Sequence, residues 1–157
     1  MLKMMLKLLK SAHSVGEANM HLQFTPKYRK PIFEDEDIRM TCEQMFIGIA
    51  ESLGISLAGV GFGPDHAHLF VTGCKNYSAA ELAQRFKGAS SRVIRKNCWE
   101  KLSKWLYGDS MWSDGYFYRT VGAVSNESMR RYVVESQKKH WTAQKAATTQ
   151  TTLLHFN

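Results

Sequence analysis

The stretch Gly63-Pro64-Asp65-His66-Ala67-His68-Leu69-Phe70-Val71 combines a turn with an apolar run. The Pro64-Asp65 pair is typical of a turn, and Leu69-Phe70-Val71 has the composition of a strand. Residues two apart on a strand point to the same face, so the imidazoles of His66 and His68 are predicted to project together. Two neutral imidazoles on one side of a rigid strand form part of a coordination shell for a divalent ion. A third ligand is then needed, with open positions for substrate or water.

The segments around this stretch predict an α+β fold. Strands are expected at residues 19–25, 55–62, 66–72 and 116–124, with helices at 34–53, from Ser78 to about 96 and from Ser125 onward, and a short helix or turn within 97–107. This order predicts an antiparallel sheet with helices packed on one face, as in ferredoxin-like and RRM-like sandwiches.

The helix ends carry clear signals. Four acidic residues, 34–37, complement the positive end of the first helix, and Gly54 can end it. Ser78 is predicted to cap the next helix, with Glu81 completing a capping box.

Length and composition indicate one domain of 157 residues. We expect an N-terminal extension at 1–12, a catalytic domain at 13–141 and a flexible tail at 142–157. The extension, rich in Lys, Leu and Met, is expected to be an amphipathic helix or partly disordered; its apolar runs are too short to span a membrane. Three scattered cysteines (Cys42, Cys74, Cys98) predict free thiols in a reducing cytoplasm.

The net charge is +7, and the basic residues are concentrated in one region. Between Lys75 and Lys104 there are eight Lys and Arg against two Glu. Such a cationic face suits a nucleic-acid backbone, although a merely solvated helix face is the plainer alternative. The residues expected to contact DNA are Lys87, Ser90, Ser91, Arg92 and Arg95 of this region, with Lys27, Arg29 and Lys30 of a basic turn.

Four blocks in sequence order carry a family resemblance. They are residues 21–33 (HLQFTPKYRKPIF) with 66–68, residues 86–92 (FKGASSR), residues 112–117 (WSDGYF) and Tyr132. Through them, residues 13–141 resemble the HUH nucleases and, more narrowly, the single-tyrosine transposases of the IS200/IS605 type. The resemblance implies the HUH nuclease fold.

The resemblance also implies a mechanism. Tyr132, which composition alone would treat as a packing residue, is implied to attack single-stranded DNA at hairpin-bearing element ends and form a 5′-phosphotyrosine. Mg²⁺ or Mn²⁺ held by His66 and His68 would assist. A homodimer, with each tyrosine helix completing the partner's metal site, is implied as well.

The third metal ligand departs from the family pattern. The family places Gln four residues after the tyrosine, where this chain has Ser136. Gln137 is five residues on, roughly 140° from the tyrosine's direction in a regular helix. Glu135, three residues on, shares the tyrosine's face. Gln137 brought inward by a bulge, Glu135, or an impaired site are the open possibilities.

Other functions remain open. A non-catalytic hairpin-binding protein derived from such an enzyme is one. A tyrosine recombinase acting on dispersed repeats, and a phosphodiesterase that uses the two histidines as acid and base, are others. Asp65 is expected chiefly to form the turn, with orientation of an imidazole as the second role. Tyr28, Trp112, Tyr116 and Phe117 are available as base-stacking residues, although core packing is the expectation we favour for each of them.

Overall fold

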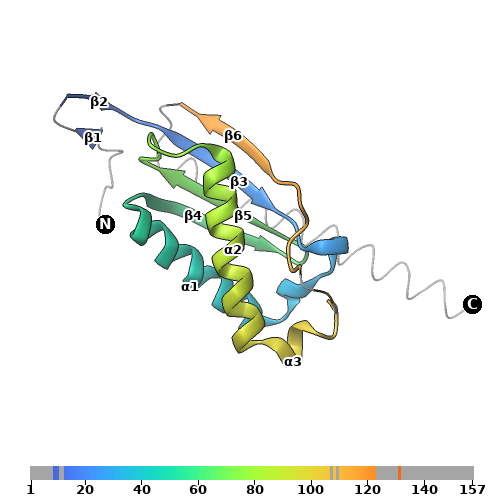
Figure 1. Ribbon diagram of the computed structural model, residues 1–157. Coiled ribbons are helices and arrows are strands. Elements are labelled where there is room, and N and C mark those ends of the chain that lie inside the picture. The colour runs from blue at the N-terminus through green and yellow to red at the C-terminus, as the bar shows by residue number, and fades with distance from the viewer. Residues whose placement is uncertain (1–8, 11–12, 107, 109, 123–130, 132–157) are drawn as a thin grey trace, which may run out of the picture.

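The computed structural model describes residues 9–10, 13–106, 108, 110–122 and 131. Within them, one antiparallel sheet has the spatial strand order β4-β5-β3-β6. These strands are β3 (Asn19–Phe24), β4 (Ser56–Gly63), β5 (His66–Thr72) and β6 (Phe117–Val121). Two long helices, α1 (Glu36–Leu53) and α2 (Ala79–Asn97), lie across one face of the sheet (Figure 1). The predicted α+β fold class is confirmed.

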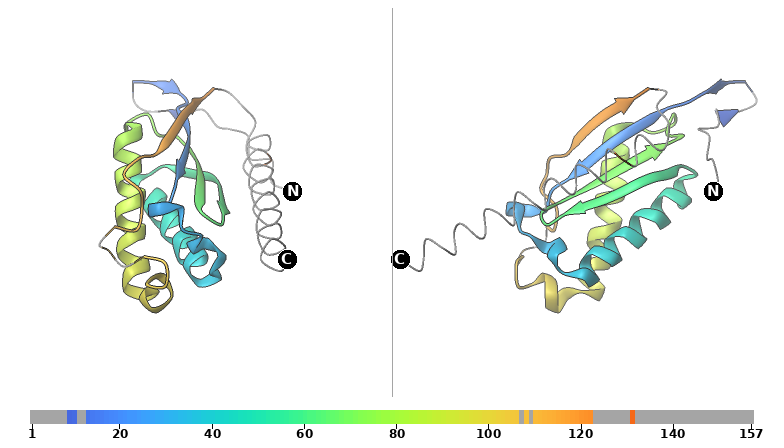
Figure 2. Two further views of the ribbon diagram at one scale, coloured as in Figure 1. Left: turned by 90° about the vertical axis from the view of Figure 1, so that its right-hand side faces the viewer. Right: turned by 180° about the vertical axis from the view of Figure 1, so that it is seen from behind.

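The sheet face beneath the helices forms the core. Met20, Leu22 and Phe24 alternate along β3 and are buried, and the register sets Leu22 opposite Leu69 of β5. Their side chains join those of α1 and α2 in a single apolar cluster. Figure 2 shows this helix layer on one side of the sheet. Because side chains alternate along a strand, the residues between these positions belong to the opposite face.

The end of α1 and the start of α2 are where the sequence predicts, whereas α1 begins at Glu36, two residues later than expected, because Asp35 caps it. The Asp35 carboxylate accepts hydrogen bonds from the backbone N–H groups of Asp37 and Ile38, at 3.0 and 3.1 Å. Gly54 ends α1 with a left-handed φ of 68°, a conformation that glycine adopts without steric cost. At the start of α2, Ser78 and Glu81 form the predicted capping box.

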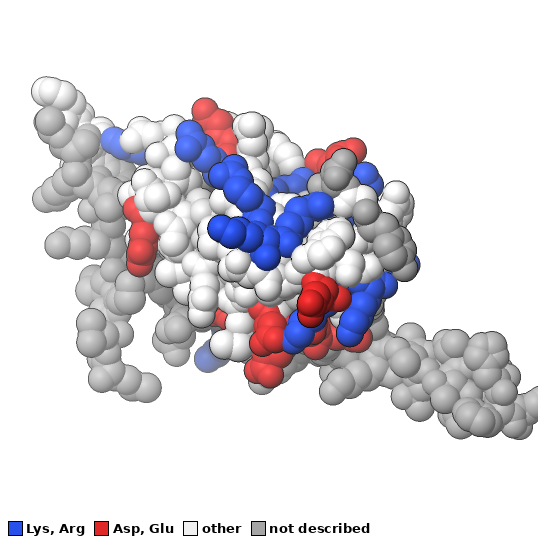
Figure 3. All heavy atoms as spheres, turned by 60° about the horizontal axis from the view of Figure 1, so that its bottom comes forward, with Lys and Arg blue, Asp and Glu red and all other residues white. Residues whose placement is uncertain are grey.

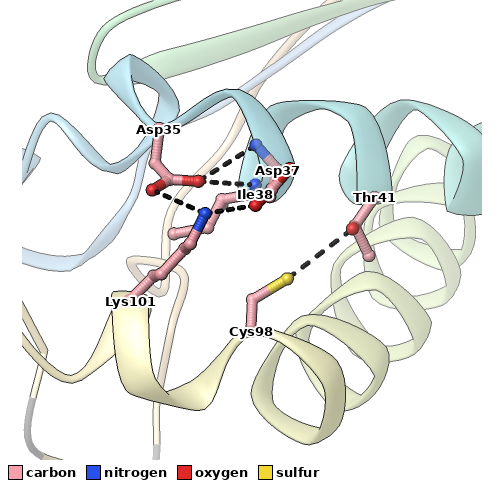
Figure 4. Close-up of polar contacts among 6 residues, drawn as sticks. All are labelled: Asp35, Asp37, Ile38, Thr41, Cys98 and Lys101. Carbon is pink, nitrogen blue, oxygen red and sulfur yellow. Dashed lines mark hydrogen bonds and ion pairs between the residues drawn. The ribbon is translucent and has the colours of Figure 1, made fainter.

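A short helix, α3 (Trp99–Leu102), packs the end of α2 against the start of α1. Lys101 forms ion pairs with Asp35 and Asp37, and the Cys98 thiol lies 3.6 Å from the Thr41 hydroxyl (Figure 4). All three cysteines are buried and free. The turn η1 (Lys27–Arg29) and the turn η2 (Ile32–Glu34) connect β3 to α1.

The N-terminal region differs from expectation. The strand β1 (Leu9–Lys10) pairs with β2 (Val15–Gly16), so the amphipathic helix or disorder expected for the N-terminal extension is wrong for residues 9 and 10. Backbone pairing with a nearby extended segment prevails there over the helical pattern of Leu and Lys. The helix expected from Ser125 lies outside the described residues apart from position 131. No helix in the described part of the chain is both long and apolar enough to cross a membrane.

Candidate metal centre and nucleic-acid interface

The sheet face opposite the helices carries both histidines of the β5 motif. His66 and His68 are buried, with 2% and 3% of their surface exposed. Their ring centroids lie 4.8 Å apart and the ring planes are nearly perpendicular, at 86°. Ala67, between them, points into the core. The period-two spacing thus brings the two imidazoles together on a rigid strand.

The imidazole of His66 occupies space that a neighbouring glycine leaves. Gly63 of β4 pairs with His66 in the antiparallel register. A Cβ atom at Gly63 would lie 2.2 Å from Cε1 of His66, far inside van der Waals contact. The close approach of the ring therefore requires glycine at this position.

A carboxylate orients His66. The Nδ1 atom of His66 lies 2.9 Å from Oδ1 of Asp65, and Oδ2 of Asp65 accepts a hydrogen bond from Nε of Arg29 at 3.2 Å. Asp65 also occupies the turn between β4 and β5. It therefore combines both expected roles, the turn and the orientation of an imidazole.

A third histidine orients His68. Nε2 of His21, on β3, lies 3.0 Å from Nδ1 of His68, and the two rings stack with centroids 5.2 Å apart. Burial, and then the nearby charge of Arg119, lower the pKa of His21, which favours a neutral ring. The sequence reasoning assigned His21 no role. The alternation along β3 could have indicated this role, because it points the His21 side chain to the face opposite the core residues Met20 and Leu22.

These contacts fit a divalent ion. Because Nδ1 of each ligand candidate is engaged, by Asp65 for His66 and by His21 for His68, the coordinating atom in each ring would be Nε2. Among the described residues, no group of three His, Cys, Asp or Glu side chains could hold a metal. The predicted third ligands, Gln137 and Glu135, lie outside the described residues, as does Tyr132.

The basic turn stands beside this centre. Tyr28 and Arg29 have φ values of 60° and 51°, in the left-handed region that non-glycine residues rarely adopt. Tyr28 is 77% exposed, and Lys30 is exposed as well. Arg29 contacts Asp65 while most of its side chain stays in solvent. The turn therefore connects an exposed basic surface to the partner of His66.

One row of α2 supports the segment that leads into β6. The Lys87 ammonium donates hydrogen bonds to the carbonyl oxygens of Ser113, Asp114 and Gly115, at 2.6, 3.3 and 3.3 Å. Burial lowers the pKa of Lys87. Arg95, two turns further on, donates to the carbonyl oxygen of Gly108 at 2.7 Å. Both residues were predicted to contact DNA, and the structure gives each of them a structural contact.

Ser90 is a correction to the predicted DNA contacts. It is fully buried, its hydroxyl donates to the carbonyl oxygen of Phe86 at 2.6 Å, and it accepts from Nε1 of Trp112 at 3.0 Å. A hydroxyl committed in the core has no access to phosphate. Trp112 is likewise a core residue and no stacking platform, whereas Tyr116 and Phe117 are partly exposed.

A second row of α2 faces solvent. Arg85, Arg92 and Lys96 are exposed and lie on one side of the helix at spacings of seven and four residues. Ser91 is half-buried beside this row and lines a shallow pocket with Lys87 and Trp112. Figure 3 shows Lys and Arg side chains gathered on one surface of the molecule, with acidic groups at its border. This surface has the charge that a phosphate backbone requires.

Comparisons with known proteins agree with the geometry. The family described as "Transposase IS200 like" matches residues 14–137. The ISDra2 transposase TnpA of Deinococcus radiodurans is 25% identical over 132 residues, which cover 84% of this chain and 92% of that protein. A crystal structure of a candidate transposase from Deinococcus radiodurans R1 superposes with a TM-score of 0.65 at 23% identity, over 83% of this chain and 98% of that one.

A more distant structure shares the fold. The REP-associated tyrosine transposase bound to a REP hairpin superposes with a TM-score of 0.55 at 9% identity, over 85% of this chain and 76% of that one. The family match spans most of the sequence, including β3, the histidine strand β5 and α2. This chain therefore belongs to the family of IS200-like transposases.

Proposed function

We propose that this transposase cleaves and rejoins single-stranded DNA at the hairpin-bearing ends of a mobile element, through a 5′-phosphotyrosine on Tyr132. The observation that carries the proposal is the pair of buried imidazoles on β5, each with its Nδ1 atom held by a specific partner. Held in this way, His66 and His68 can present Nε2 to one divalent ion. Family membership supports the choice of DNA transposition as the reaction.

The proposed chemistry exchanges one phosphodiester for another. The phenol oxygen of Tyr132 attacks the scissile phosphorus, and the bond from phosphorus to the 3′ oxygen of the preceding nucleotide breaks. The phenol proton is lost to solvent, and the departing oxygen gains a proton to become a 3′-hydroxyl. Because the phosphotyrosine keeps an activated ester, a 3′-hydroxyl from another strand can reverse the step without ATP.

A phenol with a pKa near 10 is a weak nucleophile at neutral pH. A bound Mg²⁺ or Mn²⁺ would polarise the scissile phosphate and stabilise charge on the departing oxygen. The residues described here would fix the two imidazoles and exclude water around them. An amide oxygen from Gln137 or a carboxylate from Glu135 would complete the protein ligands, and either oxygen suits these ions.

The DNA would approach along exposed basic groups. The Lys27–Lys30 turn lies beside the histidines, and Arg92 with its neighbours on α2 supplies a cationic row. Tyr28, Tyr116 and Phe117 have exposed ring surface on which unpaired bases can stack. We further propose a homodimer in which the Tyr132 segment of one subunit serves the metal centre of the other.

The test is a covalent-adduct assay. End-labelled single-stranded DNA carrying the inverted-repeat hairpin that flanks the gene is incubated with protein and Mg²⁺, Mn²⁺ or EDTA, then resolved on a denaturing gel. We expect a metal-dependent protein–DNA band that is lost in Tyr132→Phe and in His66→Ala. Mixing Tyr132→Phe with His66→Ala subunits should restore the band if sites are completed by the partner subunit.

Two outcomes would contradict the proposal. Hairpin binding without an adduct under any metal would favour a non-catalytic binding protein, which the Ser136 departure from the family pattern motivates. Cleavage that leaves no adduct and survives Tyr132→Phe would indicate hydrolysis and remove the proposed role of Tyr132.

A further inference from the structure

We propose that His21 is a positioning residue of the metal centre. Its Nε2 atom would accept the proton that His68 carries on Nδ1, and so fix Nε2 of His68 toward the ion. The inference rests on the proposed function, because it assumes that His68 is a metal ligand. It assigns a task to a residue of β3 that would act on the ion through His68.

The two rings are held by the sheet. His21 and His68 lie on adjacent strands, and the β3–β5 register sets His21 opposite Phe70 and Gln23 opposite His68. His21 therefore reaches His68 diagonally, giving the 3.0 Å contact between Nε2 and Nδ1 and a nearly parallel stack with an interplanar angle of 23°. Both side chains are buried. A buried stack between paired strands leaves the His68 ring little freedom to turn.

The direction of the hydrogen bond follows from the chemistry of coordination. An imidazole that binds a metal through Nε2 uses the lone pair of that nitrogen, so its proton resides on Nδ1. Nδ1 of His68 must then donate, and Nε2 of His21 must accept. In a neutral His21 ring, the remaining proton is consequently on Nδ1.

His21 thus does for His68 what Asp65 does for His66. Outer partners of this kind fix the tautomer and the ring orientation of a ligand histidine. The two partners differ in chemistry: Asp65 is an anion that Arg29 also contacts, whereas His21 is an aromatic ring that stacks on the residue it orients. The two candidate ligands are therefore oriented by chemically different partners, a carboxylate for His66 and an imidazole for His68.

The first experiment measures Mn²⁺ affinity by electron paramagnetic resonance, which needs no DNA and no turnover. His21→Phe keeps a ring that can stack but cannot accept, and should weaken Mn²⁺ binding about 10- to 100-fold. His21→Gln places an amide oxygen near the position of Nε2 and should recover most of the affinity. Val121→Ala, which trims a side chain packed against Phe70 on the same sheet face, should leave it unchanged.

Thermal unfolding without metal is recorded for each variant so that affinity is compared only among folded proteins. Equal affinity in wild type and His21→Phe would overturn the inference. Equal losses in His21→Phe, His21→Gln and Val121→Ala would also overturn it, because packing alone would then position His68. A wild type that binds no Mn²⁺ would instead contradict the proposed metal centre itself.

The second experiment reads the protons directly and does not depend on any variant folding. Long-range ¹H–¹⁵N correlation spectra of the protein saturated with diamagnetic Mg²⁺ distinguish protonated from unprotonated ring nitrogens. We expect His68 to be protonated at Nδ1 and His21 to be unprotonated at Nε2. The reverse pattern, with His21 donating to His68, would overturn the inference.

Discussion

The sheet face under α1 and α2 is apolar, whereas the opposite face carries three histidines, with His66 held by Asp65 and His68 by His21. The two faces are built from the same strands: on β5, Leu69 points into the core and His68, its neighbour in sequence, points away from it. The difference indicates that alternate residues of one strand can serve different purposes: those on the core face stabilise the fold, and those on the opposite face form the candidate metal centre. A substitution on one face should therefore disturb one property far more than the other.

The largest contrast is expected between these two neighbours. His68→Ala should reduce Mn²⁺ affinity and metal-dependent cleavage by more than the roughly 100-fold that loss of an outer partner costs. It should lower the free energy of unfolding by only about 1–2 kcal/mol, because His21 loses a buried hydrogen-bond partner. Leu69→Ala should lower that free energy by about 2–5 kcal/mol, because it leaves a cavity in the core. Metal affinity is measured by titration and the free energy of unfolding by urea denaturation. Comparable destabilisation by both variants would contradict the assignment of stability to one sheet face and metal binding to the other.

A second contrast uses two glycines. Gly63→Ala would place a methyl carbon 2.2 Å from Cε1 of His66, so we expect at least a 10-fold loss of Mn²⁺ affinity and a destabilisation of about 1–3 kcal/mol. Gly48→Ala, on the exposed side of α1 with open space around it, should stabilise the protein by up to about 1 kcal/mol and leave binding unchanged. Wild-type affinity in Gly63→Ala would show that the ring position does not matter.

The carboxylate behind His66 should have a graded effect. Asp65→Ala removes the acceptor for Nδ1 of His66 and should weaken Mn²⁺ binding about 10- to 100-fold. Asp65→Asn keeps an acceptor oxygen and should lose less. Isothermal titration of both variants provides the measurement, and identical losses would indicate that the charge rather than the hydrogen bond is essential.

The smallest effects are expected on α2, where the two rows of basic residues can be compared. Arg92→Ala should lower hairpin affinity modestly, reduce the salt dependence of binding by about one phosphate contact, and leave stability within about 0.5 kcal/mol. Lys87→Met should destabilise the protein by about 0.5–1.5 kcal/mol, since three carbonyl oxygens, two of them exposed, lose their donor. Fluorescence anisotropy at several salt concentrations measures hairpin affinity, and thermal unfolding measures stability. A loss of stability in Arg92→Ala and a loss of affinity alone in Lys87→Met would contradict the roles assigned to the two rows.

Local signals predicted much of this molecule. Strand β5 spans the expected residues 66–72, and the Ser78–Glu81 capping box and the Gly54 helix end occur as expected, because each depends on residues close in sequence. The His66–His68 pairing follows from strand periodicity alone. These features need no knowledge of the tertiary structure.

The remaining features depend on contacts between distant segments. His21 meets His68 across 47 positions of sequence, and Lys87 reaches carbonyl groups 26 to 28 residues away. Ser90 has the residue type of a phosphate contact, yet its burial is decided by Trp112, 22 residues on. No local pattern encodes which strand or segment such a side chain will meet.

The most direct test of the account is anomalous diffraction from crystals grown with Mn²⁺. We expect one anomalous peak within coordination distance of Nε2 of both His66 and His68, with His21 and Asp65 on the far sides of the two rings. The same map would identify Gln137 or Glu135 as the third protein ligand. The absence of a peak at saturating Mn²⁺, or a peak that involves neither histidine, would contradict the metal centre and the function built on it.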